Sequence, residues 1–224
     1  MRDAPDGPDG NRGTAGAETW QDALDRRQAD AFRGYVQPVL GPYLAAVDAL
    51  AAAGGQLSVE VEKRLLDTGE ATLKFLVTVL VSRYRQAARH SQKLDQALLG
   101  LARPSMGTYT GLLRDLLKYG GGSDDPLFEQ AAEFCTTPVP PLVFDRMREL
   151  GRQLDYPTPA RVRGFAHLLD LLVVYRNRFA HGATADPAAL GGRVPPLAVM
   201  TVALLDGLGF LLSCPLRSVD EVVE

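Results

Sequence analysis

Apolar residues recur along most of this chain at intervals of three and four, which places them on one face of an α-helix. The clearest run lies between Ser58 and Ala88. Its apolar positions are Leu65, Leu66, Leu73, Leu76, Leu80 and Tyr84. Two-residue alternation, the mark of a half-buried strand, is hard to find. The pattern therefore predicts an all-α protein built as a multi-helix bundle.

Proline, glycine and capping residues set the boundaries of the predicted helices. Pro38 and Pro42 are expected to separate the first two helices, and Gly182 to Pro195 is expected to be a loop before the last. The expected helices are Trp20 to Val36, Tyr43 to Ala53, Ser58 to Ala88, Ser91 to Leu101, Ser105 through Leu117, Asp125 to Cys135, Pro140 to Leu154, Thr158 to His181 and Pro196 to Ser213.

The chain divides into one helical domain and two ends. Residues 1–17 are rich in Gly, Pro, Asp and Arg and contain almost nothing to bury, which predicts a disordered tail. The helical pattern fills residues 18–214, which we expect to form a single domain. Residues 215–224 show no clear stop signal, so we interpret them as a tail or the start of a further segment.

Composition narrows the function classes. The hydrophobic fraction of 46% supports a sizeable core, and a net charge of −3 means that any site for an anionic ligand must be local. Cys135 and Cys214 are isolated, so we expect no disulfide framework, no metal site and a reducing cytoplasm. The apolar run Leu73 to Val81 is too short to span a membrane, and the run Leu197 to Ser213 contains Asp206.

The residues that carry chemistry gather at the end of the helix predicted from Thr158. Arg176, Asn177 and His181 lie within about one and a half helical turns, and the chain has 3 His in all. Arginine binds phosphate, histidine transfers protons and an amide orients either group. Their proximity makes this segment a candidate for chemistry on a phosphate.

The order Arg176-Asn177-x-x-x-His181 resembles the R-N-x-x-x-H signature of the HEPN superfamily of all-helical nucleases and nucleotide-binding modules. The resemblance implies a HEPN-like bundle and a metal-independent RNA endonuclease without a cofactor. In that family Arg and His serve the scissile phosphate, and the polar residue after Arg supports them. The resemblance therefore implies that Arg176, Asn177 and His181 are the catalytic residues. The resemblance also implies a homodimer through the motif helix, an effector or antitoxin partner protein, and a role in bacterial defence or a toxin-like stress response.

Other polar residues surround the motif. Apolar residues at steps of three and four form a stripe that is predicted to face the core, with a polar face opposite it. The stripe consists of Phe165, Leu168, Leu172, Tyr175 and Phe179. The candidate substrate-binding residues are Arg178, His167 and Arg163 on the motif helix and Arg193 in the loop before the last helix.

Structural interpretations remain open beside the catalytic one. His181 before Gly182 also suits a helix C-terminus, where a cation is favoured. Glu70 could orient Arg176, although a surface pair with Lys74 is the favoured interpretation. Arg176 lies about 140° from His181 on an ideal helix. The alternative function is therefore a non-catalytic helical interaction or nucleotide-sensing module attached to a separate effector.

Overall fold

The computed structural model describes residues 19–88, 90–99, 104–157, 164–180 and 186–213, and these residues are helical apart from turns and one isolated bridge between Pro138 and Gly164. The all-α prediction is confirmed for them, whereas the predicted tails lie outside them. The helices are α1 Trp20–Ala23, α2 Arg26–Ala31, α3 Gln37–Ala52, α4 Val59–Gln86, α5 Gln92–Leu99, α6 Met106–Gly120, α7 Pro126–Thr136, α8 Pro141–Gln153, α9 Phe165–Ala180 and α10 Leu190–Gly207, with 3-10 turns at Pro187–Ala189 and Gly209–Ser213.

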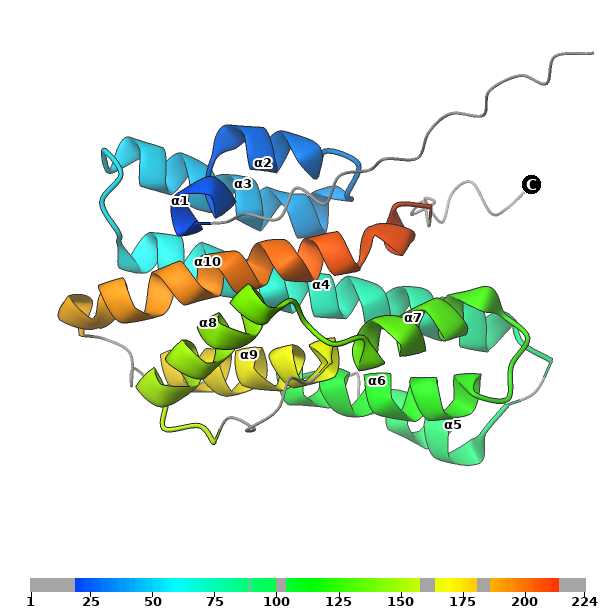
Figure 1. Cartoon of the computed structure of the whole chain (residues 1–224). Helices are drawn as coiled ribbons and strands as arrows, with labels where there is room; N and C mark the ends of the chain where they lie inside the picture. The colour runs from blue at the N-terminus through cyan, green and yellow to red at the C-terminus, as the bar shows by residue number, and fades with distance from the viewer. Residues whose placement is uncertain (1–18, 89, 100–103, 158–163, 181–185, 214–224) are drawn as a thin grey trace, which may run out of the picture.

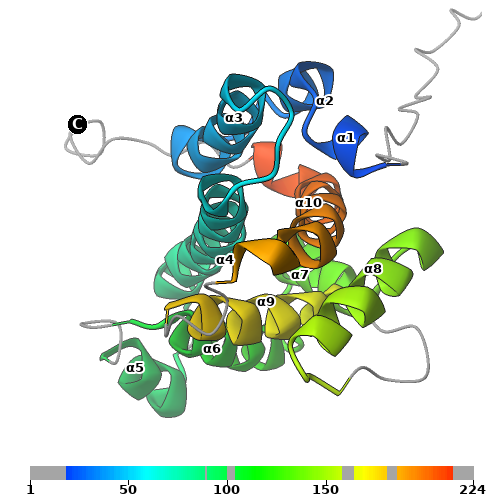
Figure 2. The same ribbon diagram turned by 90° about the vertical axis from the view of Figure 1, so that its left-hand side faces the viewer.

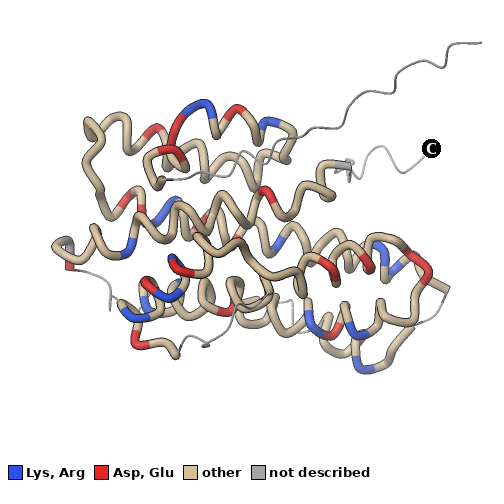
Figure 3. The backbone as a smooth tube through the Cα atoms, in the orientation of Figure 1, with Lys and Arg blue, Asp and Glu red and all other residues tan. Residues whose placement is uncertain are grey.

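Helices α4 and α10 run side by side through the middle of the molecule (Figure 1). Helices α1 to α3 cover one side of this pair, and α6 to α9 cover the other (Figure 2). Arg193 and Asp206 are the two charged residues of α10, and Figure 3 shows that most charges lie on the surrounding helices. The apolar sequence of α10 therefore matches its central position.

Several predicted boundaries are confirmed by their capping contacts. The Ser58 hydroxyl accepts from the backbone N–H of Val61, and the Ser105 hydroxyl accepts from that of Thr108. Asp125 caps α7, with Pro126 in its first turn. All six apolar positions predicted for the buried face of α4 are buried.

The predicted helix from Trp20 to Val36 is wrong, because two short helices replace it. Thr19 and Asp22 form a capping box at the start of α1, and the Asp25 carboxylate accepts from the backbone N–H of Arg27 to start α2. A second cap so close to the first reorients the chain. Both Ala23 and Ala29 are buried in the resulting corner.

Prolines do not end helices where the sequence predicted it. Helix α3 begins at Gln37, with Pro38 in the first turn, where a missing N–H costs no hydrogen bond, and it continues through Pro42. Helix α10 likewise begins at Leu190 and contains Pro195 and Pro196. Burial of both helices against α4 outweighs the local cost of these prolines.

The helix predicted from Thr158 to His181 is interrupted at Gly164. Gly164 pairs with Pro138 in the isolated bridge, and α9 begins at Phe165. A Cβ at Gly164 would lie 2.3 Å from the carbonyl oxygen of Cys135, so the close approach of the two segments requires glycine. Thr158 itself lies outside the described residues.

A buried ionic network joins α4, α9 and α10. Glu62 is completely buried, and its carboxylate accepts from Arg193 Nε at 2.6 Å and from Arg193 Nη2 at 3.3 Å. The Tyr175 hydroxyl also donates to Glu62. Burial, and then the neighbouring carboxylate, raise the pKa of Tyr175 well above its ordinary value, so this hydroxyl stays protonated. The network fixes three helices against one another.

Replacing Arg193 by methionine is expected to lower the free energy of unfolding by about 3–5 kcal/mol, because Glu62 is left charged and unpaired in the core. In the double variant Glu62→Leu/Arg193→Met the free energy of unfolding should fall by much less, because no charge is left unpaired in the core. Urea unfolding at pH 7, followed by circular dichroism, measures both. The exposed pair of Arg33 with Asp30 provides the control, and Arg33→Met should cost below about 1 kcal/mol. Equal losses for the two single variants would contradict a structural role for Arg193.

Candidate functional site

Four of the predicted site residues lie in or beside the described part of α9, and one lies elsewhere. His167, Arg176, Asn177 and Arg178 belong to α9. The predictions for His181 and Arg163 lie outside the described residues. Arg193 is not in a loop but in the first turn of α10, buried against Glu62. Its guanidinium also donates from Nη2 to the carbonyl oxygen of Asp186 at 3.3 Å, which indicates a structural role.

One carboxylate organises the cations beside the motif. Arg176 Nε donates to Glu70 Oε2 at 3.0 Å, and Lys74 Nζ lies 2.6 Å from Glu70 Oε1. The three side chains are 31%, 21% and 43% exposed for Arg176, Glu70 and Lys74. Each oxygen of Glu70 thus holds one cation at a position that solvent reaches.

The ionisation of Glu70 follows from these contacts. Partial burial raises the pKa of this carboxyl, but the hydrogen bonds and charges of Lys74 and Arg176 outweigh burial and lower it overall. Glu70 is therefore ionised at neutral pH. Because its pKa is lowered in the folded state, the stability that this group contributes is present at neutral pH and is lost as the pH falls through the folded pKa.

An aromatic ring completes the cluster. Lys74 Nζ lies 5.8 Å from the centre of the Tyr109 ring, within the range of a cation–π contact. Tyr109 belongs to the first turns of α6 and is half-buried. We call Glu70, Lys74, Tyr109 and Arg176, which come from α4, α6 and α9, the motif cluster.

The remaining candidates on α9 have other neighbours. Asn177 is exposed, and Arg178 Nη1 lies 3.9 Å from Asp155 Oδ2 after the end of α8. The His167 ring lies 6.0 Å from that of Tyr156. The structure therefore brings Arg176 together with Glu70 and Lys74, and it places Arg178 and His167 beside residues that follow α8.

Glu70 pairs with both Arg176 and Lys74, although the sequence favours the pair with Lys74 alone. A usable signal was present: Glu70 lies beside buried positions of α4, and Arg176 follows the buried Tyr175 at the edge of the apolar stripe. Half-buried charges on two packed helices need partners, which favours a pair between the helices.

Comparisons with family models, with curated proteins and with solved structures find no match to this chain. The resemblance to the HEPN superfamily therefore depends on the motif residues and on the helical architecture.

Two further observations concern the described residues alone. No group of three or more His, Cys, Asp or Glu among them is placed to hold a metal ion. None of the helices they form combines the length and the apolar character needed to cross a membrane.

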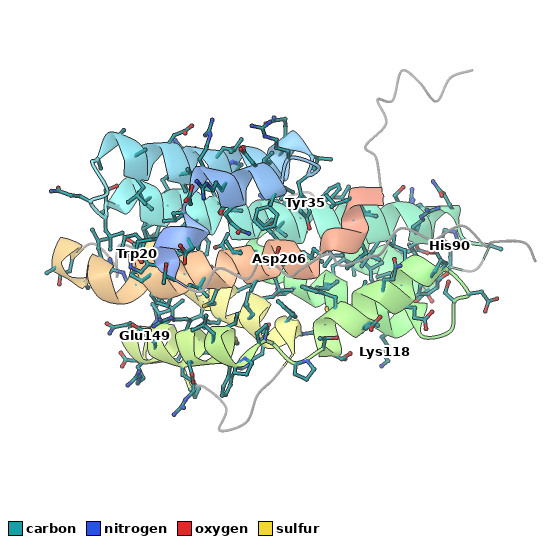
Figure 4. All side chains as sticks on the ribbon, turned by 45° about the horizontal axis from the view of Figure 1, so that its top comes forward. Trp20, Tyr35, His90, Lys118, Glu149 and Asp206 are labelled. Carbon is teal, nitrogen blue, oxygen red and sulfur yellow. The ribbon has the colours of Figure 1, made fainter. Side chains whose placement is uncertain are left out.

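A second perturbed carboxyl lies away from the motif cluster, at the surface of α10. Asp206 is exposed, yet partial burial by the surrounding helices raises its pKa to about 6. Figure 4 shows it beside Tyr35, whose hydroxyl donates to the carbonyl oxygen of Leu205. Both Asp206 and Tyr35 border the region where α1 to α3 cover α10. We therefore expect the ionisation of Asp206 to affect the stability of the fold and not the motif cluster.

Asp206→Asn is expected to stabilise the protein at pH 7.5 and to have a smaller effect at pH 4.5. A carboxyl with a raised folded-state pKa opposes folding as the pH rises from about 4 to 6, because ionisation is easier in the unfolded chain. After allowance for solvent screening of this exposed group, the melting temperature should rise by about 2–4 °C at pH 7.5. Calorimetry at both pH values measures this, with Asp124→Asn at an exposed position as control. A difference in melting temperature between Asp206→Asn and the wild type that is the same at both pH values would contradict a raised pKa of Asp206.

Proposed function

We propose that this protein is a metal-independent RNA endonuclease of HEPN type, with Arg176, Asn177 and His181 as its catalytic residues. The supporting observation is the position of Arg176, whose Nε is held by Glu70 at 3.0 Å while the side chain remains 31% exposed. Among the described residues, neither Nη1 nor Nη2 of Arg176 has a hydrogen-bond partner. A guanidinium fixed through Nε is oriented in advance for a phosphate.

In this mechanism the ribose 2′-oxygen attacks the adjacent phosphorus and the bond to the 5′-oxygen breaks. His181 removes the 2′-hydroxyl proton or protonates the leaving oxygen, Arg176 stabilises the charge on the phosphorane, and Asn177 orients the pair. The products are a cyclic phosphate and a 5′-hydroxyl. We further propose a role in bacterial defence or a toxin-like stress response, with an effector or antitoxin partner.

Labelled RNA incubated with the purified protein in EDTA tests this proposal. His181→Ala and Arg176→Ala should each reduce the cleavage rate by about 10²–10⁴-fold, the usual cost of losing a general acid or base or a charge-stabilising group. His90→Ala is the matched control, since His90 is exposed and pairs with Asp95 on the neighbouring α5. Cleavage that survives His181→Ala, or that requires added Mg²⁺, would rule the mechanism out.

The alternative is a non-catalytic interaction or nucleotide-sensing module. The observation that favours it is the pairing of both Arg176 and Lys74 with an internal carboxylate, which suits reversible anion binding as well as catalysis. The same assay separates the two functions. Bound RNA or nucleotide that is never cleaved supports the module, and a cyclic phosphate product supports the nuclease.

We also propose that two copies of the chain pair through the C-terminal end of α9. Asp170, on the polar face opposite the apolar stripe of α9, forms an ion pair with Arg114 of α6, so α6 covers the start of this face. Asn177 remains exposed nearer the C-terminus of α9. The contact between copies is therefore expected around Asn177.

Asn177→Lys is expected to shift a dimer towards monomer, because a two-fold axis near this residue brings the two new charges together. Light scattering coupled to size exclusion measures the mass at several concentrations. The control is Lys118→Glu, which changes the charge of an exposed residue near the C-terminal end of α6 (Figure 4). A wild-type protein that is monomeric at concentrations where it cleaves RNA would contradict the dimer.

A further inference from the structure

The Tyr109 ring has no assigned task in the chemistry of Arg176, Asn177 and His181. It is half-buried on α6 and belongs to the edge of the core, so its position is fixed by packing. Lys74 lies over its face at 5.8 Å, and the same ammonium group contacts Glu70 at 2.6 Å. One carboxylate therefore connects the ring with the guanidinium of Arg176.

This arrangement has the two parts that single-stranded RNA needs. Nucleobases stack on aromatic side chains, and phosphates pair with nearby cations. Tyr109 offers a ring whose place is set by the helix, and Lys74 is 43% exposed on a flexible stem beside it. A base on the ring and a phosphate on Arg176 would belong to the same short stretch of RNA.

We propose that Tyr109 and Lys74 form a nucleotide subsite beside Arg176. An RNA base stacks on the Tyr109 ring in place of the Lys74 ammonium, which turns on its flexible stem to a phosphate next to the one that Arg176 holds. This inference rests on the proposed function, because it takes RNA as the ligand of the motif cluster. The subsite places the strand across α4, α6 and α9 and selects single-stranded over paired RNA, since only an unpaired base can reach the ring.

A purely structural contact between Lys74 and Tyr109 would behave differently. An exposed cation–π pair contributes modestly to folding, and its loss leaves the affinity for RNA unchanged. A stacking platform contributes to affinity at each bound base. Binding, measured apart from both folding and cleavage, therefore separates the two roles.

The binding experiment uses a fluorescent single-stranded RNA with 2′-O-methyl groups, which cannot be cleaved through the 2′-oxygen, in EDTA. Tyr109→Leu should weaken binding by about 5- to 150-fold, the range for loss of one stacked base, and Tyr109→Phe should bind as the wild type does. Lys74→Gln should reduce the slope of log affinity against log salt by about 0.7, the value for one phosphate contact on a single strand.

Matched controls come from the same chain. Tyr119→Leu removes another half-buried tyrosine, whose ring packs on Tyr84 and Phe128 near the C-terminal end of α6. Lys118→Gln removes an exposed charge about 13 Å along α6 from Tyr109. Both should bind RNA as the wild type does. A loss of affinity in Tyr119→Leu equal to that in Tyr109→Leu would overturn the subsite.

A spectroscopic measurement keeps the proposal testable if Tyr109→Leu fails to fold. The chain has 1 Trp, so Tyr109→Trp in a Trp20→Phe background places the single indole at the subsite. Saturating RNA should quench its fluorescence through stacking. An unquenched indole in the presence of bound RNA overturns the proposal.

The outcomes also distinguish the subsite from the nuclease. Binding that depends on Tyr109, without cleavage of unmodified RNA by the wild type, supports the subsite and overturns the endonuclease. Cleavage that depends on His181 but is unchanged in Tyr109→Leu supports the endonuclease and overturns the subsite. Absence of any RNA binding by the wild type overturns both.

Discussion

The packing of the central helices depends on the burial of one charged residue, Glu62. A carboxylate removed from water needs a counter-charge and hydrogen-bond donors, or it destabilises the fold by several kcal/mol. Arg193 supplies both, and Tyr175 supplies a further donor. These partners lie 131 and 113 positions from Glu62 in the chain. Because the contacts are directional, they fix α9 and α10 at one register on α4, which apolar packing alone would leave looser.

That register determines where Arg176 points. Glu62 and Glu70 are separated by about 12 Å along α4 and by about 80° around it. The Glu62 carboxylate accepts from the Tyr175 hydroxyl, and the Glu70 carboxylate accepts from Arg176, the next residue of α9. Two consecutive side chains of α9 therefore contact α4 at two different positions around its axis. The two ion pairs that Glu62 and Glu70 form with arginine differ in their exposure to solvent. The Arg193–Glu62 pair is closed to solvent, whereas the Arg176–Glu70 pair is open enough to meet a ligand.

The sequence predicted those parts of the fold that local chemistry determines. The caps at Ser58, Ser105 and Asp125 were predicted because a cap and its helix are neighbours in the chain. The path of the chain through Pro42 and Pro195 was not, because packing between distant segments decides it. The loop expected from Gly182 to Pro195 also gave no reason to bury Arg193, whose partner Glu62 belongs to another helix.

The candidate site could be predicted only where its residues are neighbours in the chain. The order of Arg176, Asn177 and His181 can be read directly, and so can the i,i+4 pair of Glu70 with Lys74. The contact between Glu70 and Arg176 spans 106 positions, so the sequence supports it only as an alternative to the pair of Glu70 with Lys74. What favours it is burial, since half-buried charges at the edges of two apolar faces must satisfy each other when the faces meet.

The charge of the motif cluster is opposite in sign to that of the whole chain. Glu70 contributes −1, and Lys74 and Arg176 contribute +1 each, so the cluster carries a net charge of +1 on a protein of net charge −3. The field of the whole molecule does not attract RNA from a distance, and attraction must arise at close range. Glu70 weakens that attraction but fixes the direction of both cations. Fixed donors suit a transition state, in which charge develops at one place. The partial exposure of Arg176 and Lys74 also suits reversible binding of an anion, so the same cluster is compatible with the proposed nuclease and with the alternative binding module.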